Sequence, residues 1–241
     1  YNELDPKVIY IHSLTSNQGN PLLLPQRDHS ITAALNLGPL RFDATYYHSF
    51  NAFKNVVKEG LTGENSITLY RENVQADRLY ATVTLPIGNK KNINNYIYYL
   101  VGWDKILGEQ ANFGQIDLAP THYVYLYSSI KFKDYFGLEL IANYSSGRYD
   151  GIYNDISTYT VSAGVSKSFF KHNLTCSVFA NDIFFSQRDA GTFYYDDYSL
   201  NYLSKGSSRF IRFSVNYKFG RLKHNNYKAI AVGQEENQRV K

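Results

Sequence analysis

The feature that most constrains this chain is a repeated alternation of apolar and polar residues over short segments. The clearest case is the segment Ser207–Gly220, where apolar and polar residues take turns: Ile211, Phe213, Val215, Tyr217 and Phe219 against Arg212, Ser214, Asn216 and Lys218. Successive side chains of a β-strand point to opposite faces, so this pattern predicts a strand with one apolar and one polar face. Its length suits the roughly 9 to 11 residues that a tilted strand needs to cross a bilayer.

The same pattern recurs along the chain. It predicts strands at Ile31–Leu37, Leu40–Tyr46, Leu79–Ile87, Leu138–Tyr144, Tyr159–Val165 and Leu174–Ala180. Ile93–Trp103 and Tyr123–Lys131 also predict strands, but the alternation does not set their register, because aromatic residues occur on both faces. Val8–Ile11 predicts the end of a strand that began upstream. With the closing segment, this gives nine full strands and a tenth, partial one.

The connections between these strands alternate in length. Short turns are predicted at Gly38–Pro39, Gly88–Asn92, Lys133–Phe136 and Phe170–Asn173. Long connections are predicted at Phe50–Asp77, Asp104–Thr121, Ser146–Asp155 and Phe185–Gly206, and a loop at Thr15–Asp28, which contains Gly19, Pro21 and Pro25. Within the first of these connections, part of Ile67–Val74 is a candidate for extended structure. Short turns at one end and long loops at the other are typical of outer-membrane barrels. A soluble β-sandwich has no reason to sort its connections in this way.

Composition supports a membrane barrel over other classes. The chain has 23 Tyr and 15 Phe, yet it has no run of about 20 apolar residues that a membrane helix would need. The 25 basic and 21 acidic residues are spread along the chain without a compact basic patch, so no nucleic-acid partner is expected. We predict an all-β fold, an antiparallel up-and-down transmembrane β-barrel of about ten strands, with outer-membrane lipid around it.

A lipid-facing cation near the bilayer midplane costs about 2 to 4 kcal/mol. Arg41, Arg212 and Lys218 are therefore predicted to face the lumen or to lie near an interface, with apolar neighbours facing lipid. Tyrosines near strand ends are candidates for the aromatic girdles of a barrel: Tyr46, Tyr144, Tyr159 and Tyr217. The alternative is that they are ordinary strand aromatics.

Several short segments carry a family resemblance. They are Gly19-Asn20-Pro21 with Pro25, Glu72-Asn73-Val74, Asn181-Asp182-Ile183-Phe184, Tyr217-Lys218-Phe219-Gly220 and Glu235-Glu236-Asn237-Gln238-Arg239. In their order and spacing the chain, from about Asp5 to Lys241, resembles the C-terminal part of TonB-dependent outer-membrane receptors. The resemblance implies a larger 22-stranded barrel with an N-terminal plug, which imports a scarce nutrient (a chelated metal, a glycan or a peptide) with energy supplied through TonB.

The resemblance also implies the outer membrane of a Gram-negative bacterium. The chain begins with Tyr1 and has no signal peptide, so we expect the plug, the TonB-binding segment and the remaining strands to lie upstream. We divide the sequence into a barrel portion, residues 1–221, and a polar periplasmic tail, residues 222–241.

No catalytic group, metal site or cofactor is predicted. The six histidines show no close pair and Cys176 is the only cysteine, so neither a zinc spacing nor an intrachain disulfide is expected. The candidate ligand contacts are aromatic and acidic residues of the last long loop: Phe193, Tyr194, Tyr195, Asp196, Asp197 and Tyr198. Such side chains bind sugars, peptides or cationic chelates, although the loop also has the composition of one that packs over a barrel mouth.

The sequence is also compatible with two other functions. One is a complete small barrel with a binding or structural role. The other is a surface hydrolase that uses His48 with Asp196 and Asp197, although nothing in the sequence supplies a nucleophile, base and orienting group together.

Overall fold

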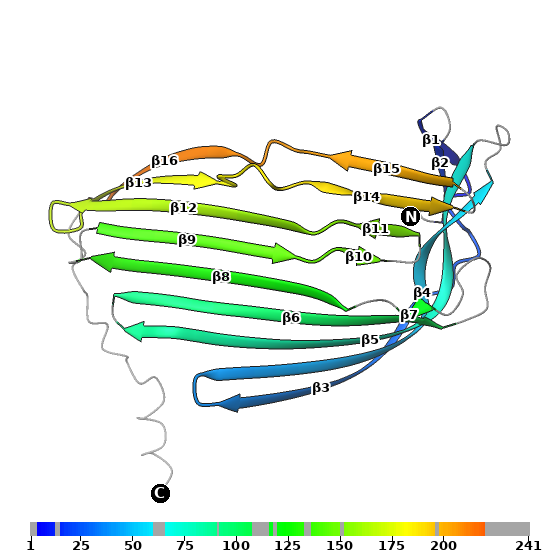
Figure 1. Ribbon diagram of the computed structural model, residues 1–241, viewed down its shortest axis with the longest axis horizontal. Coiled ribbons are helices and arrows are strands. Elements are labelled where there is room, and N and C mark those ends of the chain that lie inside the picture. Colours follow the sequence, from blue (N-terminus) through cyan, green and yellow to red (C-terminus); the bar gives the residue numbers. More distant parts are fainter. Residues whose placement is uncertain are drawn as a thin grey trace, which may run out of the picture.

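One curled antiparallel sheet dominates the computed structural model, which describes residues 4–12, 15–59, 66–90, 92–107, 116–117, 120–132, 136–149, 152–195 and 198–219 (Figure 1). Its strands, in spatial order, are β3 (Arg27–Leu37), β4 (Leu40–Glu59), β5 (Ile67–Lys90), β6 (Ile93–Leu107), β8 (Thr121–Phe132), β9 (Phe136–Ser145), β12 (Thr158–Phe169), β13 (Leu174–Asn181) and β16 (Phe210–Tyr217). Every neighbouring pair is antiparallel. The nine predicted full strands are confirmed in their predicted order.

The remaining strands are short and lie at one end of this sheet. β1 (Val8–His12) pairs with β2 (Thr15–Gln18), and β7 (Ile116–Asp117) pairs with β6. A second sheet contains β10 (Arg148–Tyr149), β11 (Tyr153–Asp155), β14 (Asp189–Tyr195) and β15 (Tyr198–Ser204). Figure 1 shows these four strands continuing the lines of β9, β12, β13 and β16 past a short break. Within the described ranges we find no helix that is long and apolar enough to span a membrane.

Tight turns gather at the opposite end, as predicted. Gly38 has φ +59°, a left-handed conformation that glycine adopts without steric cost, and it reverses the chain between β3 and β4. The β12–β13 turn uses positive φ at Phe170, Lys171 and His172 and is closed by a 3.2 Å hydrogen bond from Asn173 N to Phe170 O. The predicted turn Lys133–Phe136 falls mostly on residues outside the described ranges.

The long connections contain more strand than predicted. β4 runs to Glu59 and β5 begins at Ile67, so most of the predicted connection Phe50–Asp77 is a paired two-stranded extension. β6 likewise continues to Leu107, beyond the predicted start of a connection at Asp104. Backbone pairing with a neighbouring strand stabilises these segments, and they lack the apolar face that period-two alternation detects.

Three further loop predictions were wrong in part. Thr15–Gln18 forms β2, which pairs in parallel with β5, because the prolines that break a strand come only after it. The predicted loop Ser146–Asp155 contains β10 and β11, and Phe185–Gly206 contains the β14–β15 hairpin. The predicted tail, residues 222–241, lies outside the described residues.

The sheet has two chemically different faces. On the outward face, the apolar row farthest from the tight turns crosses β3 to β6. Its side chains are at least 40% exposed: Ile31, Tyr46, Leu79 and Trp103. The next row on this face, farther from the tight turns, is polar: His29, His48, Asp77 and Lys105. We place the outer limit of the hydrocarbon band between these rows. The proposed girdle residues Tyr46, Tyr144, Tyr159 and Tyr217 share this outward face and are 40%, 42%, 51% and 60% exposed.

The inward face carries polar residues and tyrosines. Arg41 bonds to Asp43 at 2.8 Å on this face, opposite Phe42, as predicted. Tyr96 lies between Tyr125 and Tyr127, with ring centroids 5.7 and 5.4 Å away. This packing sets the register of β6 and β8 that the sequence left open.

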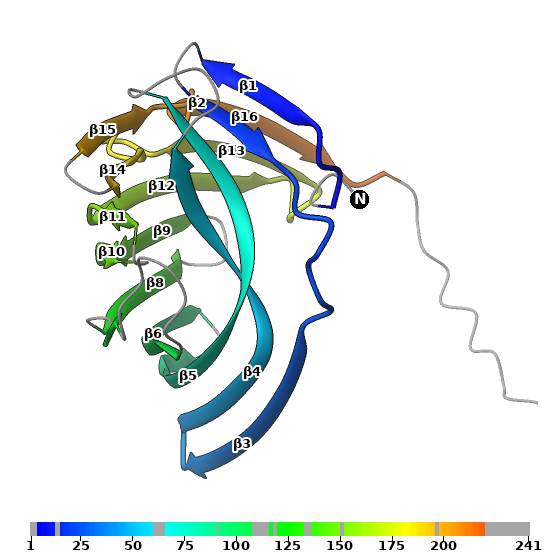
Figure 2. The same cartoon turned by 90° about the vertical axis from the view of Figure 1, so that its right-hand side faces the viewer.

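An arm formed by 52–59 of β4 and 67–74 of β5 crosses the long-loop end of the curl (Figure 2). Val56 of this arm packs with Ile152 and Phe193, and the three side chains are 4%, 8% and 5% exposed. This cluster is the largest apolar core in the described part of the chain, and it ties the β4–β5 side of the curl to the small sheet.

Candidate ligand-binding site

The arm begins at an irregularity in β4. The β4–β5 register shifts between Ser49 and Ala52, and Asn51 has φ +56°, which asparagine tolerates better than most residues. Asn73 holds this bulge in place: its Nδ2 donates to Asn51 O at 2.8 Å and to Leu24 O at 3.0 Å, while its Oδ1 accepts from Leu24 N at 2.6 Å. Two of the resemblance segments therefore meet here, since Asn73 of one fastens the loop that contains Pro21 and Pro25 of the other.

Asn20 makes a second contact between these segments. Its Nδ2 donates to Arg71 O at 2.9 Å, and its Oδ1 accepts from Leu22 N at 3.0 Å. The loop after β2 is thus fixed along β5, beside the base of the arm.

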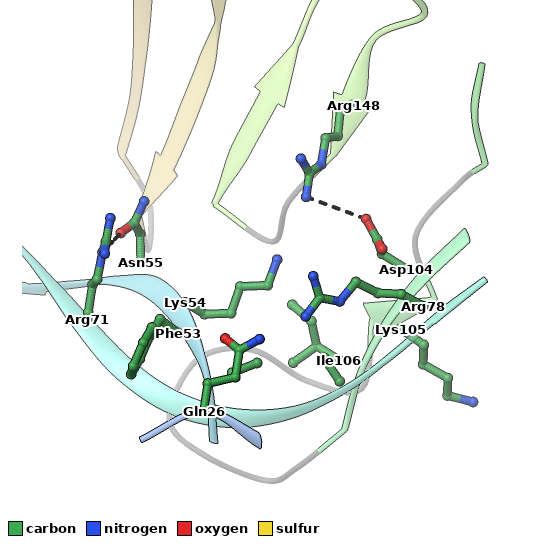
Figure 3. A pocket seen from close by; sticks show the side chains of 12 residues that line it. Gln26, Phe53, Lys54, Asn55, Arg71, Arg78, Asp104, Lys105, Ile106 and Arg148 are labelled. Atoms are coloured by element: carbon green, nitrogen blue, oxygen red, sulfur yellow. Dashed lines mark hydrogen bonds and ion pairs between the residues drawn. The ribbon is translucent and has the colours of Figure 1, made fainter. Parts of the chain in front are cut away.

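A pocket of about 330 Å³ opens at this base, between the arm and the ends of β5, β6 and β10 (Figure 3). Its floor includes apolar side chains that are only 3% exposed: Ala52, Ala76 and Ile106. The charged residues that line it are five bases and one acid: Lys54, Arg71, Arg78, Lys105 and Arg148, with Asp104. In Figure 3 the side chains of Lys54, Arg78 and Arg148 point toward the middle of the pocket, and Lys105 points away from it.

Arg78 is held incompletely. One terminal nitrogen donates to Ser49 Oγ at 2.8 Å and lies 3.9 Å from Asp28 Oδ1, while the buried Nε has no acceptor among the described residues. Hydrogen bonds from Ser49 and Gln26 lower the pKa of Asp28, which keeps that carboxylate ionised beside the guanidinium. A buried donor without an acceptor costs about 1 to 3 kcal/mol, so this arginine is not placed for stability alone.

Arg148 reaches the pocket from the small sheet. Its guanidinium lies 3.4 Å from Asp104 Oδ2, and Tyr80 donates to the other oxygen of Asp104 at 3.3 Å. The side chain of Asp104 is only 11% exposed, whereas that of Arg148 is 47% exposed. The single acid of the pocket wall thus positions one of its converging cations.

The small sheet is anchored by Asp182, which follows β13 and has φ +45°. Its side chain is fully buried and accepts from Ser186 N at 2.9 Å, Ser186 Oγ at 3.1 Å, Gln187 N at 3.1 Å and Ser208 Oγ at 2.5 Å. Burial alone would raise the pKa of Asp182, but these hydrogen bonds outweigh it and lower the pKa below its ordinary value. The Asn181-Asp182-Ile183-Phe184 segment is therefore a structural joint between the membrane strands and the small sheet.

The predicted ligand contacts lie along the β14–β15 hairpin. Phe193 is buried against Tyr153, with ring centroids 5.2 Å apart, whereas Tyr194 is 41% exposed. Tyr195 and Tyr198 close the register of the hairpin, and Asp196 and Asp197 between them lie outside the described residues. Tyr202 donates to Asp155 below the hairpin tip, and burial together with this carboxylate raises the pKa of Tyr202.

Of the residues of the hydrolase alternative the structure describes His48, whereas Asp196 and Asp197 lie outside the described residues. His48 Nδ1 lies 2.7 Å from Asp77 Oδ1 on the outward face, and Tyr46 donates to the same oxygen at 2.7 Å. Hydrogen bonds from His48 and Tyr46 lower the pKa of Asp77 against the effect of burial. The described ranges contain no group of three or more His, Cys, Asp or Glu side chains that could hold a metal ion.

The pocket residues were missed by sequence reasoning. Lys54, Arg78, Asp104 and Arg148 come from four different strands, and no local run of charge marks them. Arg78 immediately precedes the predicted strand Leu79–Ile87. Because alternate residues of a strand share a face, the sequence indicates that Arg78 lies on the same polar face as Tyr80.

An apolar outward band, a polar inward face and sorted connections together define the class of protein as a membrane β-barrel wall. The chain belongs to the outer membrane protein β-barrel family, whose model matches residues 1–217. Membership implies the outer membrane of a Gram-negative bacterium. No curated protein and no solved structure matches the chain significantly.

Proposed function

We propose that this chain forms the C-terminal barrel wall of a TonB-dependent receptor that imports a scarce nutrient across the outer membrane. The observation that carries the proposal is the direction of the two free sheet edges. Eight successive antiparallel pairings connect β3 to β16, so both edge strands run toward the tight-turn end. Among the described residues, neither strand has a partner on its outer side.

Such edges cannot close on each other in the usual way. Bacterial outer-membrane barrels have even numbers of strands, and all of their strand pairs are antiparallel. Joining β3 to β16 would instead close a barrel of nine strands with one parallel pair. Open edges are not tolerated in hydrocarbon, so an odd number of further strands has to complete the wall. A transporter barrel of about 22 strands meets this condition and has a lumen wide enough to need a plug.

The other parts of the proposal follow from this architecture. The plug and the remaining strands would belong to the same protein, and TonB would act through a segment outside this chain. Import requires ligand binding and gating rather than bond cleavage, so no catalytic residue is assigned. Exposed Tyr194 remains a proposed ligand contact, as do Tyr195, Asp196, Asp197 and Tyr198, whereas buried Phe193 would support the hairpin from below.

Binding to TonB tests the proposal. The full-length protein, extracted from the outer membrane in detergent, should bind the isolated periplasmic domain of TonB in surface plasmon resonance, and a porin serves as the control that lacks a plug. A mature protein close to 27.7 kDa that does not bind TonB would instead be a complete small barrel, and the receptor proposal would fail.

A further inference from the structure

Two cations share one aromatic ring at the joint that Asp182 anchors. Lys205 Nζ lies 3.9 Å from the centroid of the Phe185 ring, and the guanidinium carbon of Arg209 lies 4.9 Å from the same centroid. Phe185 follows β13 and has φ +53°, whereas Lys205 and Arg209 belong to the short break between β15 and β16 (Figure 1). Both cations are exposed, and together they form a cation pair.

The chain supplies no acid for this cation pair. Among the described residues, neither of its members forms an ion pair with a carboxylate. Asp182 belongs to the same joint, but its side chain is fully buried and its oxygens accept the hydrogen bonds given above. By contrast, Lys58 lies 3.9 Å over the ring of Tyr70 and also 3.8 Å from Glu72 Oε1. Like charges repel and an exposed cation–π contact is weak, so the cation pair favours an external anion.

The position of the cation pair relative to the hydrocarbon band indicates where this anion comes from. Arg209 comes two residues before Ile211, which is 62% exposed on the lipid-facing side of β16, and alternate residues of a strand share a face. The turn that contains Phe185 is fastened to β12 by a 2.6 Å hydrogen bond from Ser186 Oγ to the backbone oxygen of the girdle residue Tyr159. The cation pair therefore lies at the outer limit of the hydrocarbon band, where aromatic girdles meet the lipid headgroups.

The surroundings of the cation pair suit a lipid better than a soluble anion. Ile183 and Phe184 lie in the same turn as the shared ring and are 40% and 61% exposed, so apolar side chains are available to acyl chains beside the charges. Guanidinium and ammonium groups match phosphate oxygens. In the outer leaflet of an outer membrane, the lipid that carries phosphate groups next to acyl chains is lipid A, the anchor of lipopolysaccharide.

We propose that Lys205 and Arg209 bind a phosphate group of lipopolysaccharide in the outer leaflet. Arg209 donates a planar pair of N–H groups to the phosphate, Lys205 adds a point charge, and the Phe185 ring positions both side chains. The inference requires a membrane wall but no particular transport activity, so it goes beyond the proposed function and does not rest on it.

Lipid titrations of the delipidated full-length protein in detergent, followed by microscale thermophoresis, test this inference. The probes are diphosphorylated lipid A, chemically dephosphorylated lipid A and inorganic phosphate. We expect diphosphorylated lipid A to bind at least about tenfold more tightly than either of the other probes. If dephosphorylated lipid A binds equally well, or if neither lipid binds, the inference is overturned. Equally tight binding of inorganic phosphate would make this a site for a free anion and would also overturn it.

Variants of the cation pair and of its ring sharpen the test. Lys205→Gln and Arg209→Gln should each weaken the binding of diphosphorylated lipid A about tenfold, because one charge-assisted contact is lost. Neither should change the affinity for dephosphorylated lipid A. Phe185→Leu keeps an apolar side chain but removes the ring face, so it should reduce the preference for the phosphorylated lipid severalfold, which a merely structural role would not do.

The matched control is Arg212→Gln. Arg212 is a cation of the same strand and lies 5.3 Å from the centroid of the Phe210 ring, but strand alternation places it on the inward face. Its loss should leave the affinity for lipid A unchanged. Equal weakening by Arg209→Gln and Arg212→Gln, or no weakening by either variant of the cation pair, would overturn the inference. Because TonB is absent from the assay, phosphate preference without TonB binding would refute only the receptor proposal, and TonB binding without phosphate preference only this inference.

Discussion

Replacement of Asp182 by asparagine should open the joint between the membrane strands and the small sheet. Asparagine keeps the side-chain size and tolerates the φ of +45° found at this position. It also keeps one oxygen for Ser186, but its NH₂ group takes the place of the oxygen that accepts from Gln187 N and Ser208 Oγ. The serine hydroxyl can rotate to accept, whereas the amide of Gln187 loses its bond to the Asp182 side chain.

The magnitude follows from these contacts. A hydrogen bond to a charged group contributes about 1.5 to 3 kcal/mol, and a neutral hydrogen bond is about half as strong. We expect a total loss of about 2 to 4 kcal/mol for local opening of the joint. Hydrogen exchange with mass spectrometry on the folded protein should then show faster exchange of the peptide that contains Ser186 and Gln187, by about 30-fold or more.

The control is Asp189→Asn, the same chemical change at an exposed position nearby. Asp189→Asn should leave the exchange of this peptide unaltered. If Asp182→Asn changes exchange by less than about threefold, or no more than Asp189→Asn does, the carboxylate does not hold the joint and our reasoning is refuted.

Three further predictions concern the same end of the barrel. Phe193→Ala should destabilise the packing of the arm by about 3 to 5 kcal/mol, whereas Tyr194→Ala should cost less than about 1 kcal/mol because that side chain is 41% exposed. Limited proteolysis of the arm compares the two variants, and equal sensitivity would contradict the assignment of Phe193 to the core. Asn73→Ala should free the loop at Leu24 by removing three hydrogen bonds, which faster hydrogen exchange of Leu24 would report and unchanged exchange would contradict. The native pKa of Asp182 is lowered, so its contribution to stability is present at neutral pH and is lost as the pH falls below about 4. The protection of the joint against hydrogen exchange, corrected for the intrinsic exchange rate at each pH, should fall there in the wild type and much less in Asp182→Asn. An equal loss of protection in both proteins would contradict the assignment.

The membrane part of the fold was predictable because a lipid-facing strand has to alternate. Leu79–Ile87 shows the pattern in full, with apolar residues outward and Tyr80, Thr82 and Thr84 inward. The arm shows no such pattern, because both of its faces meet water or other protein and its pairing depends on a strand elsewhere in the sequence. The register of Ile93–Leu107 was hidden for another reason: its inward tyrosines count as apolar, and only stacking with the tyrosines of β8 distinguishes the two faces.

The pocket was not predictable for a topological reason. Lys54 and Arg78 approach each other only because the bulge at Asn51 re-aims β4 outside the membrane. Arg148 joins them because the chain after β9 stays beside the curl as part of a second sheet. Residue types and local spacing contain neither fact, although the resemblance segments that include Asn73 and Asp182 marked the joints that create both.

The central claim is that the curled sheet is a membrane wall with lipid on one face and a water-filled or plug-filled lumen on the other. Cysteine scanning of β16 from Phe210 to Tyr217, in the full-length protein with Cys176→Ala, tests it directly. A fluorophore attached to a single cysteine at Arg212, Ser214 or Asn216 should be inaccessible to a lipid-attached quencher. The same fluorophore at Ile211, Phe213 or Val215 should be quenched by it. Quenching with a period of two residues would support the account, whereas equal quenching at all positions, or the reversed pattern, would contradict it.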